Sequence, residues 1–289
     1  MDMSTSQSAN DDQILTNTSQ SSLTGCVTTV ILIVTTLFGN SVILITILRT
    51  PSLHSASNIL LSSLAVSDLA IGLVIQPMFV VYLLVPIDSE PFHALAIFLS
   101  TPSLMTITAI GVDRLLALQL HLRYVQVVTP FRVKWVVSFI WLLSAVIATS
   151  KLWMGHFFHL LQPAIFIHLL VANFVVYYKV YCVVQRHRRQ IQQQPQPQQE
   201  SNGNIYSVLS LKKSALNTFL VCIVLFLCYL PYSLYIHLNM LGALDAISPR
   251  VLIPTVTLIH LNSTLNPLMY CWRDRQIRTA VKQLFHNLI

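Results

Sequence analysis

Seven long apolar stretches constrain what this chain can fold into. Each is about as long as the 20 residues that a helix needs to cross the hydrocarbon core of a bilayer, or longer. None alternates with period two, as the strands of a membrane barrel do. The sequence therefore predicts an all-α membrane protein, a bundle of seven transmembrane helices. The expected spans are 26–48, 57–84, 92–118, 133–153, 158–184, 214–241 and 249–272.

The composition agrees with this fold class. Hydrophobic residues make up 54% of the 289 residues and charged residues only 9%, whereas soluble domains carry about a quarter charged residues. This balance excludes a soluble globular enzyme and a disordered chain. The five cysteines are too few and too scattered for a disulfide scaffold.

The basic residues indicate how the bundle is oriented. With the N-terminus outside, only Lys151 and Arg250 of the 17 Lys and Arg residues fall on the outer side. Basic residues concentrate on the cytoplasmic side of membrane proteins. The net charge of +7 thus indicates contact with the anionic inner leaflet and not with nucleic acid.

Three segments outside the spans complete the expected organisation. Residues 1–24 form a polar extracellular tail with a glycosylation sequon at Asn17. Residues 190–207 are rich in Gln and Pro and read as a flexible third cytoplasmic loop. In residues 273–289, apolar side chains recur at helical spacing, which predicts an amphipathic helix on the inner membrane surface.

Polar side chains inside the spans are the first functional candidates, because a charge at the bilayer centre costs about 2.5–3.5 kcal/mol. Asp68 lies in the middle of the second span, and Ser103, Asn262, Ser263 and Asn266 lie in the third and seventh. One carboxylate among hydroxyl and amide oxygens suits a small hard cation such as sodium. An interhelical hydrogen-bond network around a protonated Asp68 explains the same residues without an ion.

Short motifs occur in order along these spans, and together they resemble the rhodopsin-like (class A) G protein-coupled receptors. The similarity covers about 26–286 and implies the seven-helix fold. The matching residues are GNSVI with Asn40, LSSLAVSDLAIG with Asp68, Asp113-Arg114-Leu115, Trp141, Cys228-Tyr229-Leu230-Pro231 and Asn266-Pro267-Leu268-Met269-Tyr270.

The resemblance implies a mechanism. An extracellular ligand would shift the bundle to an active packing, and a heterotrimeric G protein would then meet Arg114, which Asp113 holds in the resting state. The family's sodium positions coincide with the polar residues around Asp68, which favours an allosteric sodium ion. The residues expected in activation and coupling are Asp113, Arg114, Tyr229, Pro231, Asn266, Pro267 and Tyr270.

The resemblance also implies an outward-facing ligand pocket. Ala96 stands where aminergic receptors carry the Asp that pairs with the ligand's ammonium, so we expect a small or lipid-like ligand that is not a typical biogenic amine. The pattern is nearest to the melanocortin, adenosine, cannabinoid and lysophospholipid branch, without matching one ligand set. Ser89 stands where the family has a cysteine, so no disulfide is expected. The expected lining is His93, Ala96, Ile97, Ser100, Tyr229, Tyr232, Ile236 and His260.

Further expectations concern location, partners and rival classes. The resemblance implies a multi-pass protein of the plasma membrane, with arrestin and membrane lipids as further partners. No metalloprotease or nucleophile-elbow motif indicates an enzyme, and neither internal repeats nor several charged spans indicate a transporter. A receptor relative that does not signal, or that acts as a heteromer partner, is a further alternative. Leu211 replaces the acid that many relatives pair with the third-span Arg, which predicts basal activity.

Overall fold

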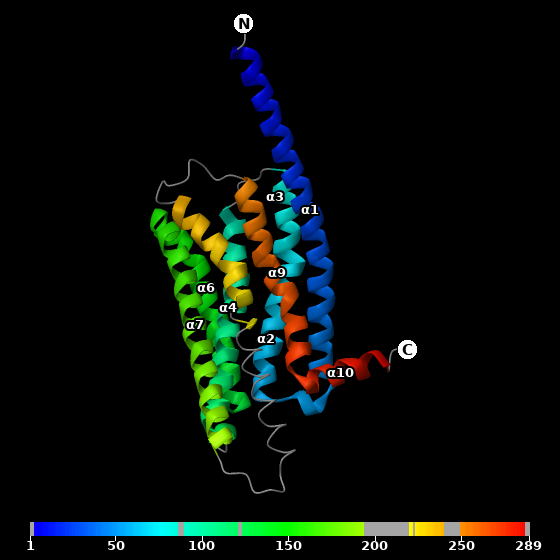
Figure 1. Cartoon of the computed structure of the whole chain (residues 1–289), viewed down its shortest axis with the longest axis vertical. Coiled ribbons are helices and arrows are strands. Elements are labelled where there is room, and N and C mark those ends of the chain that lie inside the picture. Colours follow the sequence, from blue (N-terminus) through cyan, green and yellow to red (C-terminus); the bar gives the residue numbers. More distant parts are fainter. Residues whose placement is uncertain are drawn as a thin grey trace.

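The computed structural model describes residues 3–85, 90–120, 123–193, 220–221, 223–239 and 249–286. Helices form nearly all of this part of the chain, and the long ones pack side by side as a bundle (Figure 1). The all-α bundle predicted from the sequence is therefore confirmed over the described residues. The elements are α1 (Met3–Arg49), η1 (Pro51–Leu53), α2 (Ala56–Ala70), η2 (Ile71–Ile75), α3 (Gln76–Leu84), α4 (Glu90–Leu120), α5 (Tyr124–Val127), α6 (Pro130–Met154), α7 (His156–Gln193), α9 (Pro249–Arg273) and α10 (Arg275–His286), with a further apolar helix at Ile223–Asn239.

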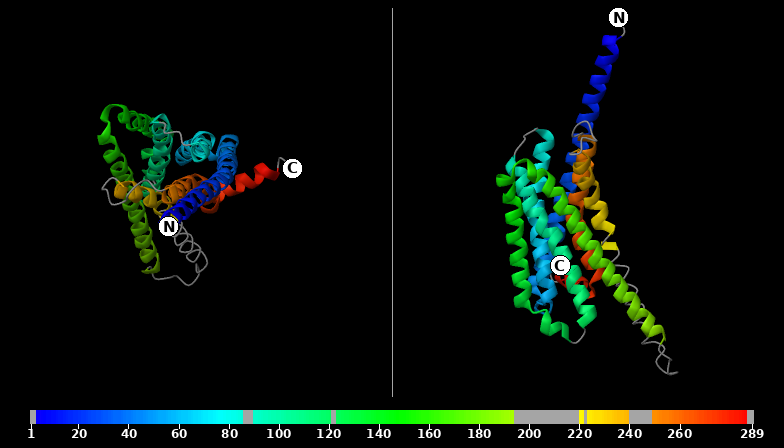
Figure 2. Two further views of the ribbon diagram at one scale, coloured as in Figure 1. Left: turned by 90° about the horizontal axis from the view of Figure 1, so that it is seen from above. Right: turned by 90° about the vertical axis from the view of Figure 1, so that its left-hand side faces the viewer.

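Length and composition alone qualify five of the described helices to cross a membrane. The helix Ile223–Asn239 is shorter, because part of the expected span 214–241 lies outside the described residues. The long helix α9 packs against α1, as the two views of Figure 2 show. The five membrane-crossing segments are Gln20–Arg49, Ala56–Leu84, Pro91–Leu120, Pro130–Ser150 and Leu161–Arg186.

Local sequence explains where several helices begin and end. The Ser55 side chain caps α2 by accepting a hydrogen bond from the backbone N–H of Asn58, and Thr129 caps α6 by accepting one from Arg132. Such caps satisfy N–H groups that have no partner within the helix. Gly155, with φ of 51°, is the only residue between α6 and α7. A side chain there would strain the backbone.

Two helices run further than the apolar stretches do. Helix α1 begins at Met3, so it continues through the polar tail. Helix α7 ends at Gln193, so the first residues of the expected loop 190–207 are helical, in keeping with the good helix propensity of Gln. Residues 194–207 lie outside the described part. Helix α10 leaves the bundle sideways and buries Ile277 and Ala280 against it (Figure 1).

The second span contains a π-turn. The segment η2 joins α2 to α3 with π-helical hydrogen bonding and is followed by Pro77. A proline ring clashes with the carbonyl four residues earlier, here that of Leu73, and a widened turn removes the clash. Beyond this turn Gln76 is fully buried, and its amide donates to the Thr36 hydroxyl at 3.4 Å.

The core and the outer surface of the bundle are both apolar. Leu64, Leu104 and Leu225 are fully buried in one cluster that joins several helices. On the outside, Phe38 and Leu73 are each 63% exposed. Large exposed apolar surface of this kind indicates contact with lipid.

Candidate functional site

A carboxylate lies at the centre of the bundle, where α2, α4 and α9 converge. Asn266 Nδ2 donates to Asp68 Oδ2 at 2.7 Å, and Ser103 Oγ donates to Oδ1 at 3.2 Å. The Ser263 side chain also hydrogen-bonds to this carboxyl group. Asp68, Ser103 and Asn266 are fully buried. The structure thus brings together residues that lie far apart in the sequence.

Two amide oxygens in this cluster accept no hydrogen bond from the protein. Asn262 Oδ1 and Asn266 Oδ1 are buried without a hydrogen-bond partner, although a buried acceptor without a partner costs about 1–3 kcal/mol. Asn262 joins the cluster through Tyr229, because its amide donates to the Tyr229 hydroxyl at 3.4 Å and that hydroxyl also hydrogen-bonds to Ser103. Together with the Asp68 carboxylate, these oxygens are the ligands that a hard cation prefers. The residues present therefore fit a sodium ion.

Toward the C-terminal end of α4, the Asp113 carboxylate is held by neighbours from α2 and α5. The Tyr124 hydroxyl donates to Asp113 Oδ1 at 2.6 Å, and the Ser57 hydroxyl donates to Oδ2. Burial, followed by the hydrogen bond to Asp113, raises the pKa of Tyr124 above its ordinary value. The phenol is therefore protonated and donates at neutral pH.

Arg114, which Asp113 is expected to hold, lines a small cavity together with it. Arg114, Tyr270 and Asp274 line this space of about 10 Å³ together with Asp113 and Ser57. The Arg114 Nε is buried without a hydrogen-bond partner. The motif residues near the C-terminal ends of α4 and α9 thus meet at one place. The hydrogen bonds of the Asp113 carboxylate come from Ser57 and Tyr124.

A second cavity, which we name the outer cavity, lies toward the opposite end of the bundle. Its volume is about 120 Å³, below the roughly 300 Å³ of a typical drug-sized site. Aromatic rings form much of its wall, and the described residues that line it include neither Asp nor Glu. Most of the expected pocket residues line it, namely His93, Ala96, Ile97, Ser100, Tyr232 and His260.

His260 forms part of the floor of this outer cavity. Its ring meets that of Phe79 edge-on, with the centroids 5.2 Å apart. The side chain is only 3% exposed, and its Nδ1 atom is buried without a partner. A ligand group that hydrogen-bonds to His260 would satisfy this nitrogen.

Two residues that we expected in the pocket do not line it. Tyr229 is buried deeper, because its ring stacks on Phe166 at a centroid distance of 6.3 Å and its hydroxyl meets Asn262. Ile236 is partly buried one turn beyond Tyr232. Since Phe166 does line the cavity, Tyr229 connects the outer cavity to the polar cluster around Asp68.

Comparison with known sequences decides the family. The family described as 7 transmembrane receptor (rhodopsin family) matches residues 39–158 and 149–270, most of the chain. The chain belongs to the rhodopsin family of seven-transmembrane receptors. It is thus a multi-pass membrane protein of the G protein-coupled receptor class and not an enzyme.

Individual relatives are distant. The histamine H2 receptor of Rattus norvegicus is 26% identical over 290 residues, which cover 90% of this chain and 78% of that receptor. The human histamine H2 receptor is 23% identical over 88% of this chain and 77% of its own length. The adenosine receptor A2b of Gallus gallus is 25% identical over 90% of this chain and 86% of its own length.

The structure adds residues to this receptor's sites that the sequence did not single out. Tyr124 and Ser57 hold Asp113 but are not among the residues predicted for activation or coupling. Gln162 and Phe166 line the outer cavity. The polar Gln162 inside an apolar span is a signal that could have been noticed.

Some expectations fall outside the described part of the receptor. The side chain of Asn17 and the residues Ser89 and Cys222 are among them. The cysteines that the structure does describe are free thiols, and they are Cys26, Cys182, Cys228 and Cys271. Pro231 lies within the helix Ile223–Asn239, and Pro267 is buried in α9.

Proposed function

We propose that this receptor lies in the plasma membrane with its N-terminus outside, binds a small uncharged ligand in the outer cavity and activates heterotrimeric G proteins through Arg114. The observation that carries the proposal is a continuous path of buried contacts. It runs from Phe166 in the outer cavity to Tyr229, whose hydroxyl hydrogen-bonds to Ser103, and from Ser103 to Asp68. Farther along α9, Tyr270 shares the inner cavity with Arg114.

Such a path can couple two sites when the bundle has two packings. A ligand that binds one packing more tightly shifts the population toward it, and the shift equals its differential affinity. Tyr229 is the residue placed to respond, because it touches both the cavity wall and the polar cluster. Rotation of its ring would change the hydrogen bond to Asn262 and so the packing of α9.

The charge of the cavity argues against an amine ligand, although relatives are named histamine receptors. Ala96 contributes only a methyl group, and the described lining carries no carboxylate. Burying an ammonium group without a partner is costly. A mostly apolar ligand with one group that reaches His260 Nδ1 fits the aromatic wall and the unpartnered nitrogen.

We further propose that sodium binds at Asp68 and favours the resting packing. The unpartnered oxygens of Asn262 and Asn266 support this assignment. Sodium and agonist would then weaken each other's binding by the same factor. At the inner surface, the amphipathic helix α10 would contact membrane lipids, and arrestin is a further partner of the same inner face.

The test is ligand-free activation of a panel of G protein subtypes, at equal surface expression of each variant. We expect a basal signal from the wild type that Arg114→Ala abolishes. Arg49→Ala, which removes an exposed cation at the inner end of α1, should keep the signal. Activation of no subtype by the wild type would support the alternative, a receptor relative that does not signal.

A further inference from the structure

A long groove runs between α1 and α9, on the face of the bundle away from the outer cavity described above. Its volume is about 1000 Å³. Gly25 on α1 explains how the two helices approach at its floor, because an added Cβ would lie 2.6 Å from Ile253 Cγ2 on α9. Ile31, which lines the groove, is 57% exposed. The groove therefore opens toward the lipid.

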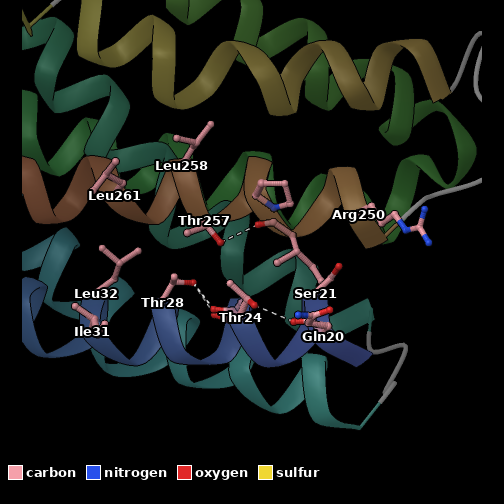
Figure 3. A pocket seen from close by; sticks show the side chains of 13 residues that line it. Gln20, Ser21, Thr24, Thr28, Ile31, Leu32, Arg250, Thr257, Leu258 and Leu261 are labelled. Carbon is pink, nitrogen blue, oxygen red and sulfur yellow. Dashed lines mark hydrogen bonds between the residues drawn. The ribbon is translucent and has the colours of Figure 1, made fainter. Parts of the chain in front are cut away.

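The polarity of the groove changes along its length (Figure 3). Arg250 and Gln20 lie at the end nearest the N-terminus, and threonines follow on both helices. Leu258 and Leu261 lie at the other end. A molecule that fits this order has a charged end, a short polar section and an apolar tail.

The positive charge of Arg250 at the polar end of the groove favours an anionic ligand. Arg250 is exposed and is the only charged side chain among the described residues that line the groove. A guanidinium presents a planar set of donors that matches phosphate or carboxylate oxygens. No lining carboxylate in the described part competes for it.

The threonine hydroxyl oxygens below Arg250 can accept hydrogen bonds from a bound molecule. Thr24, Thr28 and Thr257 each donate their hydroxyl proton to a backbone carbonyl four residues earlier, at 2.8–2.9 Å. The oxygen of each hydroxyl retains lone pairs that can accept. The polar section of the bound molecule should therefore carry a hydroxyl group, which a simple fatty acid lacks.

The length of the groove limits how much of the bound molecule it can hold. From Arg250 to Leu261 the α9 backbone rises about 16 Å at 1.5 Å per residue. That is roughly half of the 30 Å hydrocarbon core, or the depth of one leaflet. This length holds the headgroup and polar section of the bound molecule and the first part of one acyl chain, which begins at Leu258.

We propose that the α1–α9 groove binds a single-chain phospholipid with a glycerol phosphate headgroup. The phosphate meets Arg250, the glycerol hydroxyl donates to the threonine oxygens, and the acyl chain lies against Leu258 and Leu261. With the N-terminus outside, the lipid comes from the outer leaflet. This site is separate from the outer cavity, and only the choice of leaflet rests on the orientation proposed above.

Direct binding to the full-length receptor in phosphatidylcholine nanodiscs tests the site. The probe is radiolabelled oleoyl lysophosphatidate, with oleyl phosphate and oleoyl lysophosphatidylcholine as competitors. We expect saturable binding of one lysophosphatidate per receptor. The phosphate without a hydroxyl and the zwitterion should each compete at least about tenfold more weakly. Equal competition by lysophosphatidylcholine would overturn the assignment, because the charge would then not be recognised.

Variants locate the binding in the groove. Arg250→Ala should weaken binding about tenfold or more, and Arg250→Lys should restore most of it. Ile31→Trp should block the groove. Val30→Trp is the matched control, because Val30 is 49% exposed at the same depth of α1 but does not line the groove. Unchanged binding in both Arg250→Ala and Ile31→Trp would show that the lipid binds elsewhere.

Discussion

Asn266 donates a hydrogen bond of 2.7 Å to Asp68 across 198 residues of sequence. This contact joins the last turn of α2 to the C-terminal half of α9. Both side chains are fully buried, so the geometry of the pair depends on the packing of the two helices. Any ion or ligand that changes this packing acts on the same hydrogen bond.

Sodium should stabilise the wild-type receptor, and Asp68→Asn should remove the effect because it removes the anionic ligand. At about ten times its Kd, sodium adds roughly 1.4 kcal/mol to the free energy of unfolding. The measurement is the unfolding temperature in sodium chloride against choline chloride at equal ionic strength. Ser67→Ala is the control, since that hydroxyl bonds only to its own helix at Leu64. An equal sodium response in Asp68→Asn would place the ion elsewhere.

Tyr124→Phe should loosen the inner end of α4. The Asp113 carboxylate loses the 2.6 Å hydrogen bond from Tyr124 but keeps the one from Ser57. Hydrogen bonds to charged groups contribute about 1.5–3 kcal/mol, so the unfolding temperature should fall and basal activation should rise. Tyr181→Phe on the lipid-facing side of α7 should change neither. A Tyr124→Phe variant with wild-type stability would show that Ser57 alone holds Asp113.

Ala96→Asp should give the outer cavity affinity for a small amine. The new carboxylate would face a cavity whose described lining carries no charge of that sign, and it would pair with the ligand's ammonium group. We expect histamine to leave the unfolding temperature of the wild type unchanged and to raise that of Ala96→Asp. Stabilisation of the wild type by histamine would contradict the uncharged-ligand assignment.

Gly111→Ala should destabilise the contact between α4 and α7. An added Cβ would lie 2.9 Å from Val176 Cγ1, and overpacking of this kind costs about 1–3 kcal/mol. The double variant with Val176→Ala should recover most of the loss, since it removes the clashing methyl group. Unfolding temperatures of the two single variants and the double variant measure this coupling. Additive losses would show that the clash is not the cause.

Much of the bundle is predictable from the sequence because span length and polarity are local properties. The apolar runs predicted the helices, and the structure separates α6 from α7 by Gly155 alone. The members of the polar cluster can also be identified in the sequence, because Asp68 and Asn266 are polar residues inside apolar segments. Their common position follows from the family resemblance and not from their spacing along the chain.

Other features depend on tertiary contacts that no short pattern encodes. The hydrogen bond from Tyr124 to Asp113 arises because α5 folds back beside α2 and α4. The groove beside Arg250 exists because Gly25 lets α1 approach α9 at one point. Tyr229 lies below the outer cavity because its ring stacks on Phe166 from another helix.

The π-turn at Ile71–Ile75 divides the second span into α2 and α3 and rotates the side chains of α3 about the helix axis relative to those of α2. Each helical residue advances about 100° around the axis, so the inserted residue rotates everything beyond it by that angle. Asp68 precedes the turn, whereas Gln76 and Phe79 follow it. A chain one residue shorter here would keep the Asp68 carboxylate in place and present a different set of side chains to the outer cavity. The polar cluster and the lining of the outer cavity can therefore diverge independently within one membrane span.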